Sequence, residues 1–520
     1  MTGFPRVCGA LLLLSLCLFS SCDGGNILVV PIDGSHWINM KVLLEELHQR
    51  GHNLTVIRES HSMYIAETSP LYTSITIDLP GQWEDFFNFM EEVIRGHRQG
   101  RPMQSEFFNM LLGFHSFWAK ALTELLDDKA MVQRLKDSHY NLVITDPACS
   151  TGVALAKYLD LPLALNVRWI TAGDGHFAIA PSPLSYVPVP GSCLTDKMDF
   201  FQRVKNMLHY VLSSFQYKVF LEPIFNTVCE KYIKGGCDIT ALLQEADIWL
   251  FRSDFVFDFP RPTMPNVIYI GGFQCKPANP LPADLEDFVQ SAGEDGVIVM
   301  SMGSLVNGVP AEVAEEIAAI FAKLPQKVIW RHKGSRPSTL GNNTLIMDWM
   351  PQTDLLGHPQ TKLFVAHGGT NGLQEAIYHG VPVLGIPLFF DQHDNLLRLQ
   401  DRGAVKILEL LHLSQDFEES LKEVLHQDSY RRNMQRLSRL HRDQPTMPMD
   451  RAVFWVEYVM RHKGAPHLRT EANKMAWYKY YGLDVFLLLA AVATILLLSA
   501  VALFRFLCCG KGRKNKSKQQ

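Results

Sequence analysis

A glycine-rich turn lies between an apolar run, residues 363–366, and a helical pattern, residues 370–378. Glycines let a ligand approach the backbone closely, and the first turn of a helix offers unpaired N–H groups and the positive end of its dipole to an anion. The turn therefore predicts a diphosphate site, with His367, Gly369 and Asn371 as candidate contacts. A lone His-Gly-Gly is more often only a tight strand-to-helix turn, so this interpretation depends on its surroundings.

Side chains on either side of the turn suit the remaining parts of a nucleotide sugar. Trp349 offers a flat face for stacking, and Gln352 offers an amide that can bind the edge of a uracil. Glu375 lies further along the predicted helix, where its carboxylate can accept hydrogen bonds from a ribose. Asp391 and Gln392 follow the next apolar run and combine an acceptor-only group with an amide, the mixture that sugar hydroxyls require. The complete set predicts a nucleotide-sugar site rather than a bare turn.

Two polar residues in the first half of the chain follow predicted strands. His36 comes after the strand predicted at residues 27–31, and Asp146 after the one at residues 142–145. Because the carboxyl ends of parallel strands line the crevice of an open α/β sheet, both residues should reach a ligand site. An imidazole there can take a proton from an attacking hydroxyl, and a carboxylate can hold its other ring nitrogen. His36 is the candidate general base and Asp146 its support; an ordinary loop histidine is the alternative.

Strand and helix patterns alternate in two sets along the chain, which is typical of parallel α/β sheets. A proline-rich stretch, residues 276–284, separates the sets and looks like an interdomain linker. We therefore expect an α/β protein with two Rossmann-like domains, residues 23–275 and 285–445, that face each other across a cleft. Further helices and a membrane-proximal segment should occupy residues 446–484.

Length and composition agree with two globular domains. The chain has 520 residues, of which 47% are hydrophobic and 20% are charged. Its formal net charge of -4 argues against nucleic acid as a partner, because proteins that bind the phosphate backbone usually present a strongly basic face.

The segment from Trp349 to Asn395 resembles the signature of the family 1 UDP-glycosyltransferases, and specifically of the vertebrate UDP-glucuronosyltransferases. The similarity covers essentially the full chain. One departure is Phe390, because the family usually has glycine directly before the Asp-Gln pair, and a phenyl ring there would narrow or reshape the sugar pocket. Five other segments look like family segments in family order: Gly34-Ser-His36, Ile144-Thr-Asp146-Pro, Ser185-Tyr-Val-Pro188, Phe257-Asp-Phe-Pro-Arg261-Pro and Ser301-Met-Gly303-Ser304.

The resemblance implies the GT-B arrangement of the two domains and an inverting, metal-independent transfer of glucuronic acid from UDP-glucuronate to a hydroxyl group of small lipophilic acceptors. His36 would act as the base with Asp146, while His367, Ser304 and Arg261 would stabilise the departing UDP. The UDP-sugar is a co-substrate, so no cofactor is expected. Two alternatives stay open: the same mechanism with UDP-glucose, UDP-N-acetylglucosamine or UDP-xylose, and a non-catalytic nucleotide-sugar-binding membrane protein.

Both ends of the chain carry targeting signals. A basic residue, an apolar run and small residues give residues 1–22 the layout of a secretory signal peptide. Residues 485–504 contain no charge and are long enough to cross a bilayer, and residues 505–520 form a basic tail. The last five residues, 516–520, resemble a dilysine retrieval signal. We expect a single-pass type I protein of the endoplasmic reticulum membrane, with both domains lumenal and the tail cytosolic. Whether it forms a homo- or hetero-oligomer is left open.

Two further features are less specific. Five cysteines fall in the predicted lumenal region without a zinc-type spacing, and Cys229 with Cys237 is one candidate disulfide, although sequence does not fix the connectivity. The apolar segment at residues 107–118 suits an acceptor pocket, a membrane contact or an ordinary core helix.

Overall fold

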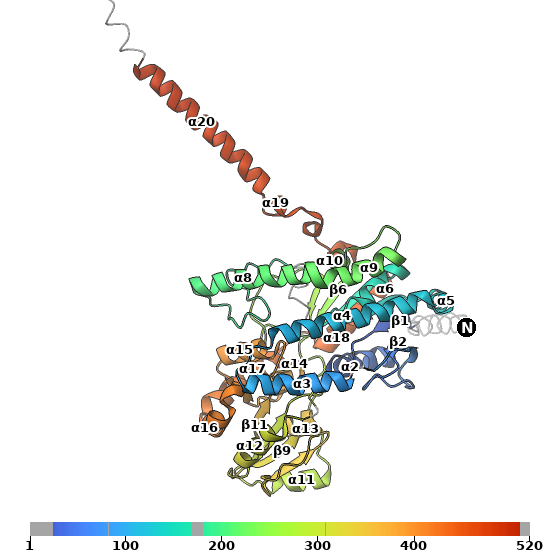
Figure 1. The fold of residues 1–520 in the computed structure, drawn as a ribbon, viewed down its shortest axis with the longest axis vertical. Helices are drawn as coiled ribbons and strands as arrows, with labels where there is room; N and C mark the ends of the chain where they lie inside the picture. The colour runs from blue at the N-terminus through green and yellow to red at the C-terminus, as the bar shows by residue number, and fades with distance from the viewer. Residues whose placement is uncertain (1–23, 82, 169–179, 307, 510–520) are drawn as a thin grey trace, which may run out of the picture. The chain divides into compact units, whose positions relative to one another are not determined.

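The computed structural model describes residues 24–81, 83–168, 180–306 and 308–509, so the predicted signal peptide and the predicted retrieval signal lie outside the described residues. The chain divides into two compact units, one ending at Arg469 and one starting at Thr470. The first unit contains two parallel sheets, and the second contains the predicted membrane helix (Figure 1).

The first sheet has seven parallel strands in the order β3-β2-β1-β4-β5-β6-β7. Its strand order reverses between β1 and β4, and the carboxyl ends of strands at such a switch point are where open α/β sheets bind ligands. His36 and Asp146 follow these two strands. The strands are β1 (Asn26–Val30), β2 (Asn53–Glu59), β3 (Thr73–Ile77), β4 (Leu142–Thr145), β5 (Leu163–Val167), β6 (Ile248–Phe251) and β7 (Val267–Tyr269).

The second sheet has six parallel strands in the order β10-β9-β8-β11-β12-β13. Its order reverses between β8 and β11, the strands that Ser304 and His367 follow. The two predicted Rossmann-like domains are thus confirmed. The strands are β8 (Val297–Ser301), β9 (Lys327–Arg331), β10 (Thr344–Met347), β11 (Thr361–Ala366), β12 (Val383–Gly385) and β13 (Val405–Ile407).

Helices connect the strands. Those before the second sheet are α2 (Ser35–Gln49), α3 (Trp83–Arg98), α4 (Gln104–Asp127), α5 (Lys129–Asp137), α6 (Thr151–Leu159), α8 (Phe200–Gln216), the π-helix η2 (Tyr217–Leu221), α9 (Glu222–Tyr232), α10 (Ile239–Gln244) and α11 (Ala283–Gln290). Those that follow are α12 (Ala311–Phe321), α13 (Gln352–Gly357), α14 (Thr370–His379), α15 (Gln392–Asp401), η3 (Leu410–His412), α16 (Leu413–His426), α17 (Asp428–Arg442), α18 (Pro448–His462), η4 (Pro466–Leu468), η5 (Glu471–Lys474), α19 (Trp477–Tyr480) and α20 (Leu483–Cys509).

The strands and helices that carry the site follow simple patterning. Residues 27–30 of β1 are apolar and buried, as expected for a central strand covered on both faces. On α2, Met40, Leu43, Leu44 and Leu47 recur at three- and four-residue steps and are fully buried. Burying one such side chain contributes roughly 1.5–3 kcal/mol, so this row fixes α2 on the sheet and with it the position of His36 in its first turn.

Two helices pack on the core of the other domain. Val453, Val456 and Val459 of α18 are fully buried in one apolar cluster with Ile27 of β1. In the opposite direction, α3 contributes Val93 and other apolar residues to a cluster built on the second sheet. The helix after the second domain therefore completes the first, and the two domains are held together by packing as well as by the linker.

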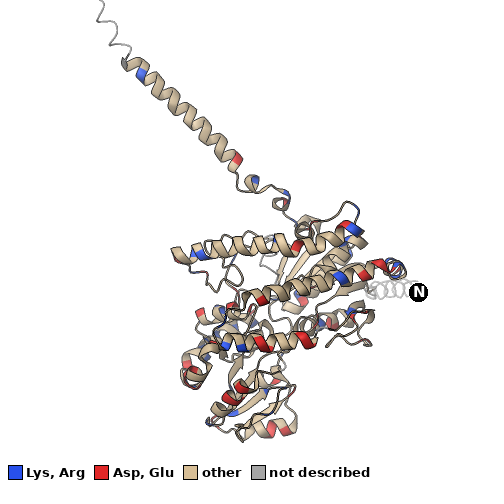
Figure 2. Ribbon diagram, in the orientation of Figure 1, with Lys and Arg blue, Asp and Glu red and all other residues tan. Residues whose placement is uncertain are grey.

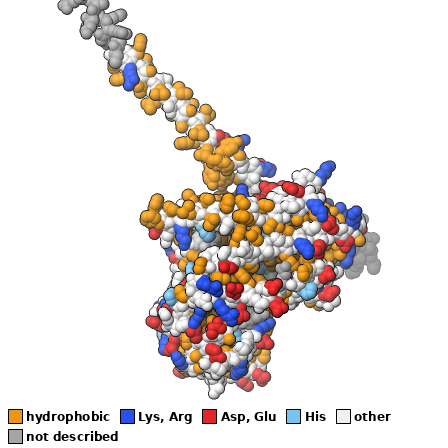
Figure 3. Space-filling model, in the orientation of Figure 1, with side chains coloured by type: hydrophobic (Ala, Val, Ile, Leu, Met, Phe, Trp, Pro, Cys, Tyr) orange, Lys and Arg blue, Asp and Glu red, His pale blue; other side chains and the backbone are white. Residues whose placement is uncertain are grey.

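The membrane helix α20 extends past both ends of the predicted residues 485–504. Its 26 residues from Leu483 to Cys508 are long and apolar enough to cross a bilayer. Its charges, Asp484 and Arg505, lie close to its two ends (Figure 2), and apolar side chains cover its length (Figure 3). In the first unit, Cys229 and Cys237 form the disulfide that was one candidate pair.

Candidate active site

A cavity of about 1040 Å³ lies where the carboxyl ends of the two sheets meet. Both domains line it. Of the twelve residues predicted for the site, ten are in its wall: His36, Ser304, Trp349, Gln352, His367, Gly369, Asn371, Glu375, Asp391 and Gln392. Asp146 lies directly behind His36, whereas Arg261 is not among the lining residues.

His36 and Asp146 form a buried pair. Nδ1 of His36 lies 2.6 Å from Oδ2 of Asp146. Gly34, which precedes α2, has φ of 78°, a conformation that glycine adopts without strain and that turns the chain from β1 into the helix. With Nδ1 engaged by the carboxylate, the predicted role of His36 as a base would fall to Nε2. Burial lowers the pKa of His36 below its usual 6.5, and the charge of Asp146 opposes this shift.

A buried arginine completes this pair. Arg252 donates from Nη2 to Oδ2 of Asp146 over 3.0 Å and from Nη1 to Oδ1 of Asn39 over 2.8 Å. Burial alone would raise the pKa of Asp146, but the interactions with His36 and Arg252 outweigh it and hold the pKa below the usual value. Asp146 is therefore a fixed negative charge behind the imidazole.

The turn between β11 and α14 has the predicted shape. Gly368 has φ of 93°, and a Cβ there would lie 2.6 Å from the carbonyl oxygen of Gln392, so only glycine fits. Gly369 is the N-cap of α14 and leaves the first N–H groups of the helix without a side-chain cap. Asn371 in that first turn donates to the carbonyl of Ser35 over 3.3 Å, beside His36. This bond joins the first turn of α14 to the residue that precedes His36.

Buried polar atoms without partners mark the same place. Among the described residues, Nδ1 of His367, Oγ of Ser304, and Nε and Nη2 of Arg331 are buried and have no hydrogen-bond partner. Buried polar groups are normally paired, so this group of atoms points to a ligand rich in oxygen atoms. Burial lowers the pKa of His367 to about 4, which keeps its ring neutral near pH 7 and able to donate one N–H.

The residues predicted to bind the nucleoside are linked to one another. Nε2 of Gln352 donates to Glu375 over 2.6 Å, and Oγ1 of Thr353 donates to its other oxygen over 2.8 Å. Trp349 keeps 56% of its surface exposed, and the Arg331 guanidinium lies 5.4 Å from the centre of its ring. One face or edge of this indole is therefore available for a base, with the positive charge of Arg331 close by.

Hydrogen bonds within the protein already occupy some of the polar atoms of Asp391 and Gln392, the two residues predicted to bind the sugar. Oε1 of Gln392 accepts N–H bonds from Leu388 over 2.8 Å and Phe389 over 3.1 Å, so Gln392 presents its amide nitrogen only. Oδ2 of Asp391 accepts a bond from Asn395 over 2.7 Å. Burial would raise the pKa of Asp391, but the charge of Arg168 and the bond from Asn395 lower it below the usual value. The pair supplies one donor and one charged acceptor.

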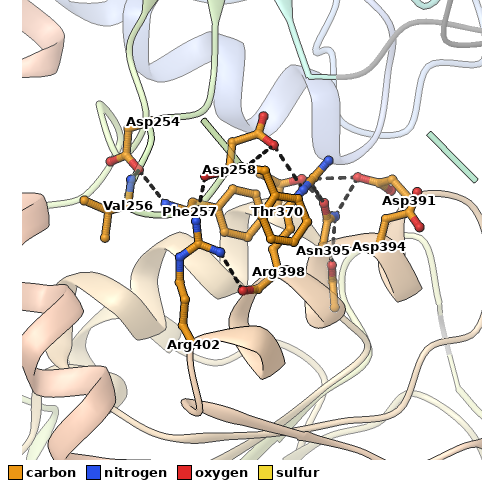
Figure 4. A network of polar contacts seen from close by, with 12 residues as sticks. Asp254, Val256, Phe257, Asp258, Thr370, Asp391, Asp394, Asn395, Arg398 and Arg402 are labelled. Carbon is orange, nitrogen blue, oxygen red and sulfur yellow. Dashed lines mark hydrogen bonds and ion pairs between the residues drawn. The ribbon is translucent and has the colours of Figure 1, made fainter. Parts of the chain in front are cut away.

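A polar network fixes Asp391 from the other domain. Arg398 contacts Asp258 of the first domain with Nε at 3.2 Å and donates from Nη1 to Asn395 over 2.6 Å (Figure 4). Arg402 donates to the backbone carbonyl of Asp258 over 2.7 Å. The segment Phe257–Pro262, in which Arg261 was the predicted contact, is connected to Asp391 through Asp258, Arg398 and Asn395. Nη2 of Arg261 lies 3.5 Å from Oγ of Ser182, and Arg261 is not among the residues that line the cavity.

Apolar and acidic residues of the first domain also line the cavity. The predicted apolar segment lies within α4, and its residues Met110, Phe114 and Phe117 are in the cavity wall. Other residues of α4, such as Leu122 and Leu125, are buried in the core, so the helix contributes both to the cavity wall and to the core. Glu59, the last residue of β2, lines the cavity as well, and burial together with the charge of Asp33 raises its pKa to about 7.

Comparison with known proteins identifies the family. A family model described as "UDP-glucoronosyl and UDP-glucosyl transferase" matches residues 25–517. The chain is 40% identical to UDP-glucuronosyltransferase 2A2 of Mus musculus, with 98% of each chain covered. It is also 40% identical to UDP-glucuronosyltransferase 1A3 of Homo sapiens, covering 97% of this chain and 94% of that one. This chain belongs to the UDP-glucuronosyltransferase family.

Solved structures support the fold of this UDP-glucuronosyltransferase. The spinosyn forosaminyltransferase SpnP is similar with a TM-score of 0.57 and 17% identity, covering 84% of this chain and 99% of that one. A UDP-glucosyltransferase from Polygonum tinctorium gives the same TM-score, identity and coverage. The two Rossmann-like domains thus form the GT-B arrangement that the sequence predicted.

Phe390, the departure from the family pattern, occupies a strained backbone position. Its φ is 54°, in the left-handed region that glycine enters freely and a bulky residue does not. The glycine that the family resemblance leads one to expect at this position would adopt this φ without strain. The ring of Phe390 lines the cavity and lies 5.6 Å from the ring of Phe107 on α4, centre to centre.

Sequence reasoning missed three arginines of this site. Arg168 follows β5 directly, Arg252 follows β6, and Arg331 ends β9. Arg168 lines the cavity and donates from Nη1 to Oγ of Ser35, and its charge acts on His36, His367 and Asp391. A basic residue at the carboxyl end of a buried strand was the signal that could have identified each of them.

Proposed function

We propose that this enzyme transfers glucuronic acid from UDP-glucuronate to a hydroxyl group of small lipophilic acceptors, with inversion at the anomeric carbon. The observation that carries the proposal is the presence of the His36–Asp146 pair and the β11–α14 turn in one cavity. A base on one domain and an anion site on the other suit an in-line displacement, in which the acceptor attacks opposite the departing diphosphate.

His36 acts as the general base in this proposal. Its Nε2 takes the acceptor's hydroxyl proton while the acceptor oxygen forms a bond to the anomeric carbon, and the bond from that carbon to the diphosphate oxygen breaks. UDP leaves with the electron pair. Asp146 stabilises the imidazolium that forms, and Arg252 keeps the Asp146 carboxylate in place.

The leaving UDP gains negative charge, and the second domain supplies groups to stabilise it. The N-terminus of α14, the Oγ of Ser304 and the ring of His367 offer hydrogen-bond donors. Arg331 and, from the first domain, Arg168 add positive charge in the cavity wall. We propose that these groups stabilise the departing UDP without a metal ion. We also propose that the UDP-sugar is the only co-substrate of the acceptor.

The donor assignment rests on the relatives, whose names are those of glucuronosyltransferases, and on the polar groups at the sugar end. Asp391 accepts hydrogen bonds from sugar hydroxyls, and Gln392 donates hydrogen bonds from its amide nitrogen. Glu375 binds the ribose, and Trp349 stacks on the uracil with Gln352 at its edge. A neutral sugar donor such as UDP-glucose is the second candidate, because the ring of Phe390 occupies space at the sugar end.

The acceptor assignment rests on the apolar wall contributed by α3 and α4. A cavity of about 1040 Å³ holds a drug-sized aglycone together with part of the donor. We further propose that α20 anchors the enzyme in the endoplasmic reticulum membrane with the two domains in the lumen.

A donor panel tests the proposal. Microsomes containing the full chain are incubated with one phenolic acceptor and, separately, with UDP-glucuronate, UDP-glucose, UDP-N-acetylglucosamine and UDP-xylose. We expect UDP-glucuronate to be preferred and NMR of the product to show a β-glucuronide. Preference for UDP-glucose would support the second candidate, an α-linked product would contradict inversion, and absence of transfer from every donor would support a binding protein.

A further inference from the structure

Gln374 of the second domain is buried against the first domain. It lies in the second turn of α14, next to Glu375, and is 1% exposed. Its Nε2 donates to the backbone carbonyl of Arg252 over 2.6 Å. Its Oε1 accepts the backbone N–H of Gly272 over 3.2 Å and a bond from Nε2 of Gln274 over 3.0 Å. One side chain of the second domain therefore holds the two segments that follow β6 and β7 of the first.

These partners allow the Gln374 amide only one orientation. A backbone carbonyl can only accept a hydrogen bond, so the amide nitrogen must face Arg252. A backbone N–H can only donate, so the amide oxygen must face Gly272. An apolar side chain at position 374 would leave these buried backbone groups of the first domain unpaired, which is costly. The contact therefore requires a side chain that both donates and accepts at this reach.

The carbonyl that Gln374 binds belongs to the arginine behind the His36–Asp146 pair. The Arg252 guanidinium donates to Oδ2 of Asp146 over 3.0 Å and to Oδ1 of Asn39 over 2.8 Å. It also donates to the backbone carbonyl of His36 over 3.3 Å. Arg252 is thus held at two places: its main chain by the second domain, and its side chain by the residues around the predicted base.

We propose that Gln374 is a positioning residue for the transfer reaction, because it holds the Arg252 main chain where the guanidinium reaches Asp146. The inference rests on the proposed function, in which His36 is the base. Among the described residues, Glu375 lines the cavity and Gln374 does not, so Gln374 acts through Arg252 and not by contact with the donor.

The place of Gln374 on α14 gives this contact its significance. The N-terminus of α14 is the site that we propose for the diphosphate, and Gln374 follows it by about one turn on the same helix. The helix that holds the donor is therefore also the helix that fixes the support of the base. The second domain contributes to the acid–base chemistry of the first through one buried amide.

Replacing Gln374 with Met keeps the length of the side chain and removes its three bonds. We expect kcat for transfer to a phenol to fall roughly 10- to 100-fold, because a misplacement of about 1 Å in an active site can cost about 100-fold in rate. UDP affinity, measured by calorimetry on the full chain, should stay close to that of the wild type, since the groups that line the cavity are kept.

The pH profile separates a displaced Arg252 from a general loss of stability. The charges of Asp146, Arg168 and Arg252 all act on His36, and the charge of Arg252 lowers the pKa of His36. A displaced Arg252 lowers that pKa less, so kcat/KM, which requires the unprotonated base, should begin to fall at a higher pH in Gln374→Met. A variant that only unfolds more easily would keep the acidic limb in place.

Two further variants complete the set. Gln374→Asn keeps an amide but is one methylene shorter, so it cannot reach Arg252 and Gly272 at once; it should change kcat and the acidic limb in the same direction, and it decides the test if Gln374→Met does not fold. Asn433→Leu is the matched control, because Nδ2 of Asn433 donates to the backbone carbonyl of Gly403 over 3.0 Å within the second domain. It should lower thermal stability and leave kcat and the acidic limb unchanged.

A double-mutant cycle tests whether Gln374 acts through the Asp146 carboxylate. In Asp146→Asn the guanidinium of Arg252 has no carboxylate to hold, so adding Gln374→Met should lower kcat much less than it does in the wild-type background. Losses that multiply independently, an unchanged kcat, an acidic limb that stays in place, or a UDP affinity that falls in step with kcat would each overturn the inference. Absence of transfer by the wild-type enzyme would instead contradict the proposed function.

Discussion

Arg398 of the second domain lies 3.2 Å from the carboxylate of Asp258 in the first domain. The same guanidinium donates to Asn395, which donates to Asp391. A contact between the domains therefore orients the carboxylate that we assign to the sugar. We therefore expect sugar binding to depend on this contact between the domains.

Breaking this chain of contacts should weaken sugar binding more than UDP binding. Arg398→Met removes the charge that Asn395 and Asp258 share, and losing a hydrogen bond to a charged group costs roughly 1.5–3 kcal/mol, or about 10- to 150-fold. We expect KM for UDP-glucuronate to rise while the inhibition constant of UDP changes little. Arg402→Met is the control, because in the described part of the chain the Arg402 side chain donates to the backbone carbonyls of Asp258 and Arg398 and not to Asn395. An equal effect of the two variants would argue against the relay.

The pH profile should report the His36–Asp146 pair. A base works only when unprotonated, so kcat/KM falls as pH drops through the pKa of His36, which burial places below 6.5. Asp146 opposes that shift, so Asp146→Asn should move the acidic limb to still lower pH and reduce the maximum by roughly 10²–10⁴-fold. Measuring kcat/KM against pH for both proteins checks this. An acidic limb that moves to higher pH in the variant would contradict the assignment.

Substitutions of Gln392 and of Glu375 should affect the binding of different parts of the UDP-sugar. Gln392→Glu keeps an oxygen for the N–H groups of Leu388 and Phe389 but replaces the donor amide with a charged acceptor. It should reduce transfer from UDP-glucuronate and spare UDP affinity. Glu375→Ala should weaken UDP and every UDP-sugar together, by about 1–3 kcal/mol. Calorimetric binding of UDP and initial rates with two donors test the division, which fails if both variants weaken UDP equally.

Phe390→Gly should widen the sugar end of the cavity without harming the fold. Glycine adopts the observed φ of 54° freely, so the midpoint of thermal unfolding should not fall appreciably. The rate with UDP-N-acetylglucosamine should rise relative to that with UDP-glucuronate, because the acetamido group needs room. Phe390→Leu, which keeps much of the bulk, is the control. Unchanged donor ratios in Phe390→Gly would show that the ring does not limit the sugar.

Sequence patterns predicted those parts of the site that depend on local structure. His36, Asp146 and His367 each follow a buried apolar strand, so their place at the carboxyl edge of a sheet could be inferred from the chain alone. The two glycines at residues 368–369 predicted that a ligand can approach the backbone closely, because this too depends only on the local sequence. Each prediction needed only a strand, a turn and the rule that ligands bind at the carboxyl ends of the strands in a parallel sheet.

The parts that sequence did not predict depend on distant segments. Which strand ends meet follows from the strand order, so the bond from Arg252 to Asp146 could not be inferred from β6 alone. The side-chain oxygen of Gln392 accepts a hydrogen bond from the backbone N–H of Leu388 in the preceding turn. The spacing of residues in the sequence does not reveal this bond. The periodicity of α8 alone would predict that its apolar side chains face the core. The buried, hydrogen-bonded Asn206 occupies the inward face instead, so the apolar side chains are exposed.

The central claim is that His36 is the base for a donor held mainly by the other domain. The most direct measurement compares His36→Ala with the wild-type enzyme for UDP affinity, by calorimetry, and for transfer to a weakly acidic phenol and to an aliphatic alcohol. We predict that UDP binding persists while transfer to both acceptors is lost. Near-normal turnover of the variant with both acceptors would contradict the account.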